Sequence, residues 1–231
     1  MGLFLSLSGV IGKSKDDVEK SIGNYLQTVQ GGIEKANVEN DDNNFCAIAE
    51  SDGGTTIMYP SYFLEWDECS KFMSRDMNAP VFSCHIHDGD FWMYILFFNG
   101  EIKDQFMPIP DYFDEHISSD ELDSWKGDAA VLARYVPNLK QESVEKYLVR
   151  WDLDEEEQKA YKDDEFTNCD WQLVDFMKKL GLTYPIDDKG NVKGTTYKLW
   201  TKNLPLKSQA HPSLTNPKLN VKAEKPWWKF W

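Results

Sequence analysis

The residues most able to do chemistry are two histidines separated by one position, His85 and His87, in the run HIHDGD. Alternate residues of a β-strand point to the same side, with Cα atoms roughly 6.5 to 7 Å apart, so both imidazoles could reach one metal ion. Asp88 or Asp90 would add an oxygen ligand. A metal-dependent enzyme centred on His85 and His87 is therefore one hypothesis, although zinc and iron sites normally need a third well-placed ligand.

The same residues also fit an ordinary β-meander. Asp88-Gly89 and Asn99-Gly100 are dipeptides typical of type I′ turns, and β-branched and aromatic residues flank both of them. We expect positive φ angles at the two glycines. With a two-residue turn at Asp88-Gly89, His85 lies opposite Trp92 in the neighbouring strand.

This register sorts the meander into two faces. One face is entirely apolar and is predicted to be core; it consists of Phe82, Cys84, Ile86, Phe91, Met93, Ile95 and Phe97. The other face mixes aromatic, polar and charged side chains, among them His85, His87, Asp90, Trp92 and Tyr94. Such a mixture suits a contact that is partly desolvated. We therefore predict that the mixed face contacts a partner, a metal or the protein's own residues 118–180.

Other catalytic signatures are missing from the sequence. Neither G-x-S-x-G nor a glycine-rich phosphate loop occurs, and Cys84 is expected to face the core and to be inert. Paired carboxylates stay open as an option, because 39 acidic residues supply many pairs whose separation the sequence does not fix. The sequence therefore predicts no cofactor, assigns no metal ligand and favours a protein without enzymatic activity.

The segment at residues 225–231, KPWWKFW, is unusually aromatic. Trp227, Trp228 and Trp231 would form an exposed apolar patch unless something covered them. Three alternatives are open: docking on the protein's own body, docking of an adaptor on another protein, and an interfacial membrane anchor. The anchor is the least favoured, because the segment is short and anionic lipid would repel an acidic body.

Charge is divided unevenly along the 231 residues, whose formal net charge is −14. Residues 186–231 carry nine lysines and three acidic residues, a net +6, which leaves −20 on residues 1–185. An acidic body argues against nucleic acid as a partner and favours a basic protein. No apolar run is long enough to span a bilayer, no signal peptide is expected, and four scattered cysteines favour a reducing, cytoplasmic location.

The pattern of apolar residues predicts an α+β protein. A strand at 3–11, a helix from Ser14, a hairpin at 45–59, a helix at 66–77 and the meander follow one another. Their order is similar to that of ferredoxin-like folds, and the strands after Asn99 would extend the sheet. We predict a sheet unit at 1–112, a helical unit at 113–185 packed on it, and a basic extended tail at 186–231.

The helical unit is predicted to contain three helices. The first begins at Ser118 and reaches residue 133, the second lies at 144–151, and the third lies at 169–180 with Gly181 just beyond its end. The tail contains a candidate strand at 195–201.

These patterns favour a non-enzymatic intracellular binding protein. An acidic inhibitor or immunity-type protein that neutralises a basic partner fits the −20 body best. The metal-dependent enzyme centred on His85 and His87, and an adaptor tethered by the tryptophan-rich tail, are the alternatives.

Overall fold

The computed structural model describes residues 2–39, 42–114, 116–151 and 159–206. Within them the chain forms an eight-stranded antiparallel sheet with five α-helices, which confirms the α+β class. The strands are β1 (Leu5–Ile11), β2 (Gly32–Lys35), β3 (Phe45–Ser51), β4 (Gly54–Met58), β5 (Val81–His87), β6 (Phe91–Phe98), β7 (Glu101–Phe106) and β8 (Thr195–Trp200). The helices are α1 (Lys15–Thr28), α2 (Trp66–Asp76), α3 (Ser119–Ser124), α4 (Ala129–Tyr135) and α5 (Gln172–Lys179).

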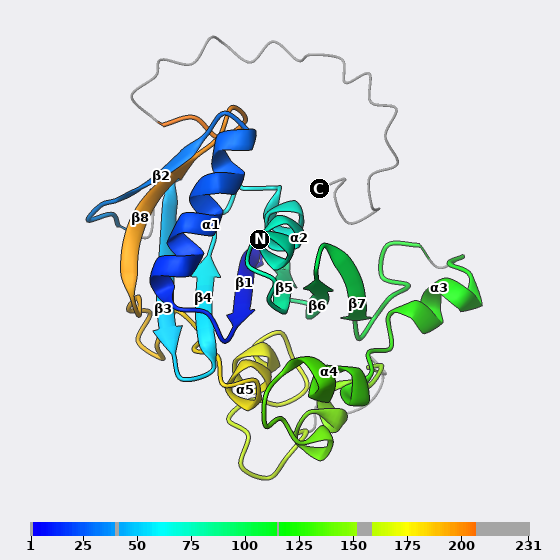
Figure 1. Cartoon of the computed structure of the whole chain (residues 1–231). Helices are drawn as coiled ribbons and strands as arrows, with labels where there is room; N and C mark the ends of the chain where they lie inside the picture. Colours follow the sequence, from blue (N-terminus) through cyan, green and yellow to red (C-terminus); the bar gives the residue numbers. More distant parts are fainter. Residues whose placement is uncertain (1, 40–41, 115, 152–158, 207–231) are drawn as a thin grey trace.

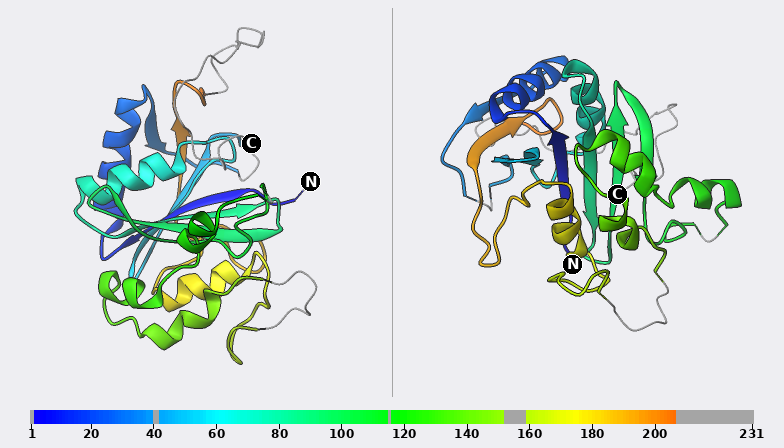
Figure 2. Two further views of the ribbon diagram at one scale, coloured as in Figure 1. Left: turned by 90° about the vertical axis from the view of Figure 1, so that its right-hand side faces the viewer. Right: turned by 60° about the horizontal axis from the view of Figure 1, so that its bottom comes forward.

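The strand order across the sheet is β2-β8-β3-β4-β1-β5-β6-β7 (Figure 1). From β1 to β5 the elements come in the order strand, helix, three strands, helix and strand, with the short β2 as the first of the three strands. Helices α1 and α2 cover one face of the sheet, whereas α4 and α5 cover the other (Figure 2, left). The sheet is therefore the middle of three layers.

Local sequence explains where two of the main helices begin or end. The side chain of Ser14 accepts a hydrogen bond from the Asp17 amide at the start of α1, as an N-cap should, and Val18, Ile22 and Leu26 are buried along one face. Helix α5 is followed by Gly181 at φ 75°, a left-handed conformation that glycine adopts without strain. Both predictions are confirmed.

The helical unit is less regular than the sequence predicts. The single helix expected from residue 118 to 133 is divided into α3 and α4, so that prediction was wrong. Gly127 has φ 68°, and the carboxylate of Asp128 accepts hydrogen bonds from the amides of Ala130 and Val131 and thereby starts a new helix. The helix predicted at 144–151 is replaced by two short 3₁₀ turns, Gln141–Ser143 and Glu145–Tyr147.

The candidate strand at 195–201 is present as β8, and it lies inside the sheet between β2 and β3. Residues 195–200 of the predicted tail thus belong to the sheet, because alternate side chains such as Tyr197 and Leu199 are buried against α1 and α2. The division of the chain into three units stays a prediction.

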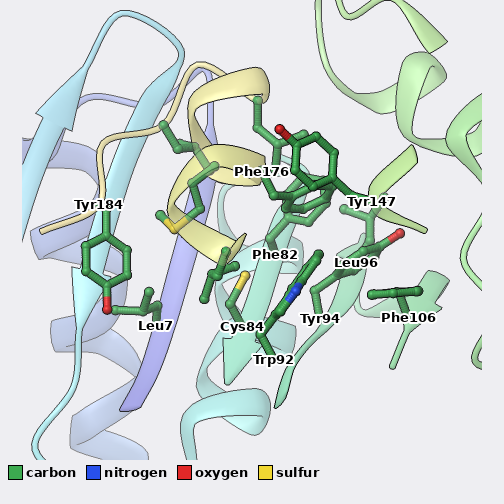
Figure 3. Packing of buried hydrophobic residues seen from close by; sticks show 14 of the residues in the cluster. Leu7, Phe82, Cys84, Trp92, Tyr94, Leu96, Phe106, Tyr147, Phe176 and Tyr184 are labelled. Atoms are coloured by element: carbon green, nitrogen blue, oxygen red, sulfur yellow. The ribbon is translucent and has the colours of Figure 1, made fainter. Parts of the chain in front are cut away.

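Both faces of the sheet are buried over most of its width. Beneath α4 and α5, one cluster unites Phe82, Trp92 and Tyr94 with Phe176 (Figure 3). On the opposite face, one cluster lies under α1 and α2, and another gathers Phe91 and Met93 near Trp125. A strand buried on both faces loses the apolar and polar alternation from which a register is usually read.

Candidate functional site

The turn between β5 and β6 sets the register of the predicted site. Asp88 and Gly89 have φ angles of 50° and 76°, and the Asp90 amide donates to the His87 carbonyl at 2.9 Å. Pairing resumes only at Phe91, which lies opposite His87, so Asp90 is an extra residue in the loop. The predicted two-residue turn was therefore wrong by one position, although the positive φ angles expected at Gly89 and Gly100 are confirmed.

A shift of one residue exchanges the two faces of the following strand. His85 lies opposite Met93, and Ile86 lies opposite Trp92, rather than His85 opposite Trp92. Every member of the predicted apolar face is buried, but the set is divided between the two sides of the sheet. Phe82, Cys84 and Ile86 lie under α4 and α5, whereas Phe91, Met93, Ile95 and Phe97 lie on the other side.

Trp92 and Tyr94 are core residues and do not share a face with the histidines. Both are 0% exposed, and Phe176 of α5 lies against them, with ring-centroid distances of 4.9 Å and 5.4 Å (Figure 3). Trp92 Nε1 donates to Gln172 Oε1 at 3.4 Å, and the Tyr94 hydroxyl donates to Asp104 Oδ2 at 2.5 Å. Residues of α5 and Asp104 of β7 therefore satisfy this half of the predicted surface.

His85 lies on the α2 side of the sheet. Its ring is stacked on the Trp66 indole with centroids 4.8 Å apart and an interplanar angle of 9°, and its Nδ1 is 3.0 Å from Ser6 Oγ. Burial lowers the pKa of His85 to about 3, and the neighbouring His87 acts in the same direction. His85 is therefore a neutral imidazole at ordinary pH.

His87 lies next to His85, with ring centroids 5.8 Å apart, among aromatic side chains. Phe4 and Phe113 meet its ring edge-on, each at 4.9 Å, and Phe91 is stacked on it at 5.5 Å. Burial lowers the pKa of His87, while two nearby aspartates oppose that shift. No hydrogen-bond partner for its ring nitrogens occurs among the described residues.

The two histidines line a cavity of about 520 Å³ that we call the histidine pocket. Its other lining residues come from the N-terminal segment that leads into β1 and from the start of that strand, from the loop before α2 and from the first residue of α2, and include Phe4, Ser6, Ser61, Tyr62, Leu64 and Trp66. Three of these are large and unusually exposed: Phe4 by 41%, Tyr62 by 67% and Leu64 by 52%. The pocket is thus an apolar depression with polar groups at His85, His87 and Ser6, the usual composition of a ligand site.

Asp90 is exposed at the loop and does not line the pocket. Its carboxylate accepts a hydrogen bond from the Tyr112 hydroxyl, and Asp88 accepts one from the Gly2 amide at 2.6 Å. These two carboxylates therefore have local structural partners. Trp227, Trp228 and Trp231, the remaining predicted site residues, lie outside the described residues.

Metal binding has little support at this site. Among the described residues, no group of three or more histidine, cysteine, aspartate or glutamate side chains could hold a metal ion. The close contact of Ser6 with His85 also resembles a nucleophile and its base, but an imidazole with a pKa of about 3 is a weak base. The arrangement is better suited to binding an apolar group than to activating a nucleophile.

Sequence reasoning missed the apolar rim of this pocket. Phe4 belongs to a predicted strand, and Tyr62 and Leu64 follow Pro60 in the run PSYFLEW, of which only Trp66 was assigned, to a predicted helix. Composition alone cannot show that Phe63 of this run is 1% exposed while its neighbours on both sides face solvent. The available signal was four bulky apolar residues clustered in a loop.

No family model matches the chain, and neither a curated protein nor a solved structure matches it. Within the described residues, no helix is both long and apolar enough to cross a membrane.

Proposed function

We propose that this chain is a non-enzymatic binding protein whose histidine pocket receives an apolar side chain of a basic partner protein. The observation that carries the proposal is the grouping of Phe4, Tyr62 and Leu64 around one cavity. Single exposed apolar residues are normal on protein surfaces, but three around a pocket are typical of an interaction site.

The charge of the body supports a basic partner. Residues 1–185 carry a formal −20, and the exposed Glu68 lies in the first turn of α2, close to the pocket residue Trp66. Such a potential speeds the approach of a positively charged protein and disfavours acidic competitors. An inhibitor or immunity-type role, in which the acidic surface masks a basic partner, fits this combination of charge and apolar anchor.

A reducing, intracellular location belongs to the same proposal. Cys46, Cys69 and Cys84 are buried thiols, and burial raises the pKa of Cys69 and Cys84 to about 12. Such thiols are inert packing residues and not disulfide partners.

Two pairs of variants test the proposal. Full-length protein with Tyr62→Ala and Leu64→Ala removes two side chains of the rim, whereas Ile102→Ala with Val149→Ala removes two other exposed apolar side chains elsewhere. Partners captured from cell extract would be quantified for each form. We expect the first pair to reduce retention of the main partner at least about tenfold and the second to leave it unchanged. Equal retention by both pairs would refute the pocket as the binding site.

Varying the ionic strength in the same capture experiment tests the electrostatic part of the proposal independently. Association that depends on the acidic body should weaken as ionic strength rises from about 0.05 to 0.5 M. A partner retained equally across that range would contradict the electrostatic part of the proposal.

A further inference from the structure

The aromatic segment at residues 225–231 and the histidine pocket have complementary chemistry. The segment contains three tryptophans, one phenylalanine and two lysines, and the pocket has an exposed apolar rim on an acidic protein. We propose that this segment docks in the histidine pocket of its own chain and competes there with the partner protein. The inference rests on the pocket being the binding site, and it assigns that site an internal competitor.

The route of the chain favours this pocket. Asn203 Nδ2 donates to Glu65 Oε1 at 3.0 Å, and Leu204 is buried in the same cluster as Trp66. Glu65 stands between Leu64 and Trp66, which both line the pocket. The chain therefore passes close to the residues that flank the pocket wall at Asn203 and Leu204, shortly before the described part of the structure ends at residue 206.

The length of the connecting segment permits docking. Residues 207–224 provide 18 positions between this exit point and the aromatic segment. A fully extended chain of that length spans about 60 Å, far more than the distance from a residue beside the wall to the cavity. Tethering on this scale gives an effective concentration on the order of millimolar, so even modest affinity would keep the pocket occupied.

A tryptophan side chain matches the polar group that the pocket leaves without a partner. The indole is a large apolar ring with one hydrogen-bond donor and no acceptor. His87 is 9% exposed, lines the pocket, and offers a neutral imidazole whose nitrogens have no hydrogen-bond partner among the described residues. The indole of Trp66 is stacked on the imidazole of His85 with ring centroids 4.8 Å apart, so an imidazole of this pocket can pack against a flat indole ring. An inserted tryptophan would bury its ring and pair its N–H with His87.

Charge favours docking within the chain. Residues 207–231 carry five lysines and one glutamate, a formal +4, which leaves −18 on the rest of the protein. Lys225 and Lys229 flank the first two tryptophans of the segment, and Glu65 and Glu68 lie next to the pocket wall. Attraction between these groups adds to the apolar contact and weakens as salt rises.

Cross-linking in the full-length chain tests the docking directly. A photoreactive benzoylphenylalanine replaces Ser61, an exposed pocket residue whose change leaves the apolar rim intact, and in a control protein it replaces Val149. We expect cross-links from position 61 to residues 225–231 within one chain, at a yield that is constant on dilution, and none of these from position 149. Cross-links from position 61 only between two chains, or only to other segments, would overturn the proposal.

Competition with a synthetic peptide, KPWWKFW, measures the occupancy of the pocket. The full-length variant Trp227→Ala, Trp228→Ala, Trp231→Ala is compared with wild type and with Leu214→Ala, Leu219→Ala, Val221→Ala, which changes the same tail outside the aromatic segment. The tryptophan variant should bind the peptide about tenfold more tightly than the other two proteins, because its pocket is vacated.

The two proposals fail in different ways. Equal peptide affinity for all three proteins would overturn docking within the chain and leave the capture experiment with Tyr62 and Leu64 unaffected. If the Tyr62→Ala, Leu64→Ala variant retains the partner as well as wild type does, and position 61 still cross-links to residues 225–231, the pocket is not the partner's binding site. The proposal that the segment docks within the chain would then stand.

Discussion

The two faces of the β5–β6 hairpin contain similar side chains but differ in how the rest of the chain covers them. On one face, Trp92 and Tyr94 are fully buried under α5, and their polar atoms bond to Gln172 and Asp104. On the other, His85 and His87 border a cavity with an apolar, solvent-exposed rim. The same mixed aromatic and polar composition thus occurs on a face that α5 covers and beside a cavity with an exposed rim.

The covering elements explain the difference. Helix α5 lies directly over the Trp92 face and contributes Phe176 to it (Figure 3). Helix α2 begins at Trp66, whose indole stacks on His85, while the pocket extends beside His87, whose ring Phe4 and Phe113 meet edge-on. The loop before α2 borders this space with Tyr62 and Leu64 and does not fill it. The histidine pocket is therefore the part of the hairpin that no described element closes.

The largest expected effect is on the closed face. Trp92→Ala should lower the free energy of unfolding by about 3 to 5 kcal/mol, because it removes a large buried ring and leaves a cavity against Phe176. Urea denaturation followed by circular dichroism would measure the loss. A change below about 1 kcal/mol would mean that Trp92 is not enclosed and that the two faces have been wrongly distinguished.

The second effect concerns the buried imidazole of the open face. The folded-state pKa of His85 is about 3, below its value of about 6.5 in an unfolded chain, so the unfolded state binds the proton more tightly. Stability should therefore fall as pH drops below about 6.5, by about 2 kcal/mol between pH 7 and pH 5 from this group alone. Because other groups also titrate, the test is the difference in pH dependence between wild type and His85→Phe.

In this comparison, His85→Phe should weaken the pH dependence of the free energy of unfolding between pH 7 and pH 5 relative to wild type. If the free energy of unfolding of His85→Phe falls between pH 7 and pH 5 as steeply as that of wild type, His85 is protonated in the folded protein. Water would then reach its imidazole.

The third effect is the loss of one hydrogen bond on the closed face. Tyr94→Phe deprives the Asp104 carboxylate of one donor, while the Asp128 amide still donates to it at 3.1 Å. We expect a loss of about 1 to 2 kcal/mol, smaller than that of Trp92→Ala because the ring stays in place. An unchanged midpoint in urea would show that water replaces the hydroxyl and that this face is open to solvent.

The smallest effect on stability should come from the rim of the pocket. Leu64→Ala changes a side chain that is 52% exposed, so the free energy of unfolding should stay within about 0.5 kcal/mol of wild type. The same variant should lose most of its partner binding. A stability loss above about 1.5 kcal/mol in differential scanning calorimetry would indicate that Leu64 belongs to the core, and the contrast between the faces would disappear.

Several elements were predictable because their signals are local. The Ser14 N-cap, the Gly181 terminus of α5 and the Asn99-Gly100 turn each depend on a few adjacent residues, and all three occur. The register after Asp88 was not predictable, because a two-residue turn and the same turn with one extra residue have the same sequence signature. Contacts of Asp88 with Gly2 and of Asp90 with Tyr112, both distant in sequence, accompany the longer loop.

The candidate site was half predictable for the same reason. His85 and His87 stand out by residue type and by spacing on a single strand, so they were found. The faces of Trp92 and Tyr94 depended on the register and were therefore exchanged. The rim of Phe4, Tyr62 and Leu64 comes from two segments about 60 residues apart in sequence, which only the pairing of β1 with β4 and β5 brings together.

Nuclear magnetic resonance of the histidine side chains tests the central claim most directly. The imidazole signals of full-length protein, with histidine isotopically labelled, would be recorded as the captured partner is added. Binding in the histidine pocket should shift the signals of His85 and His87 and leave that of the exposed His116 in place. Saturable binding of the partner with no change in the signals of His85 and His87 would contradict the claim that this pocket is the binding site.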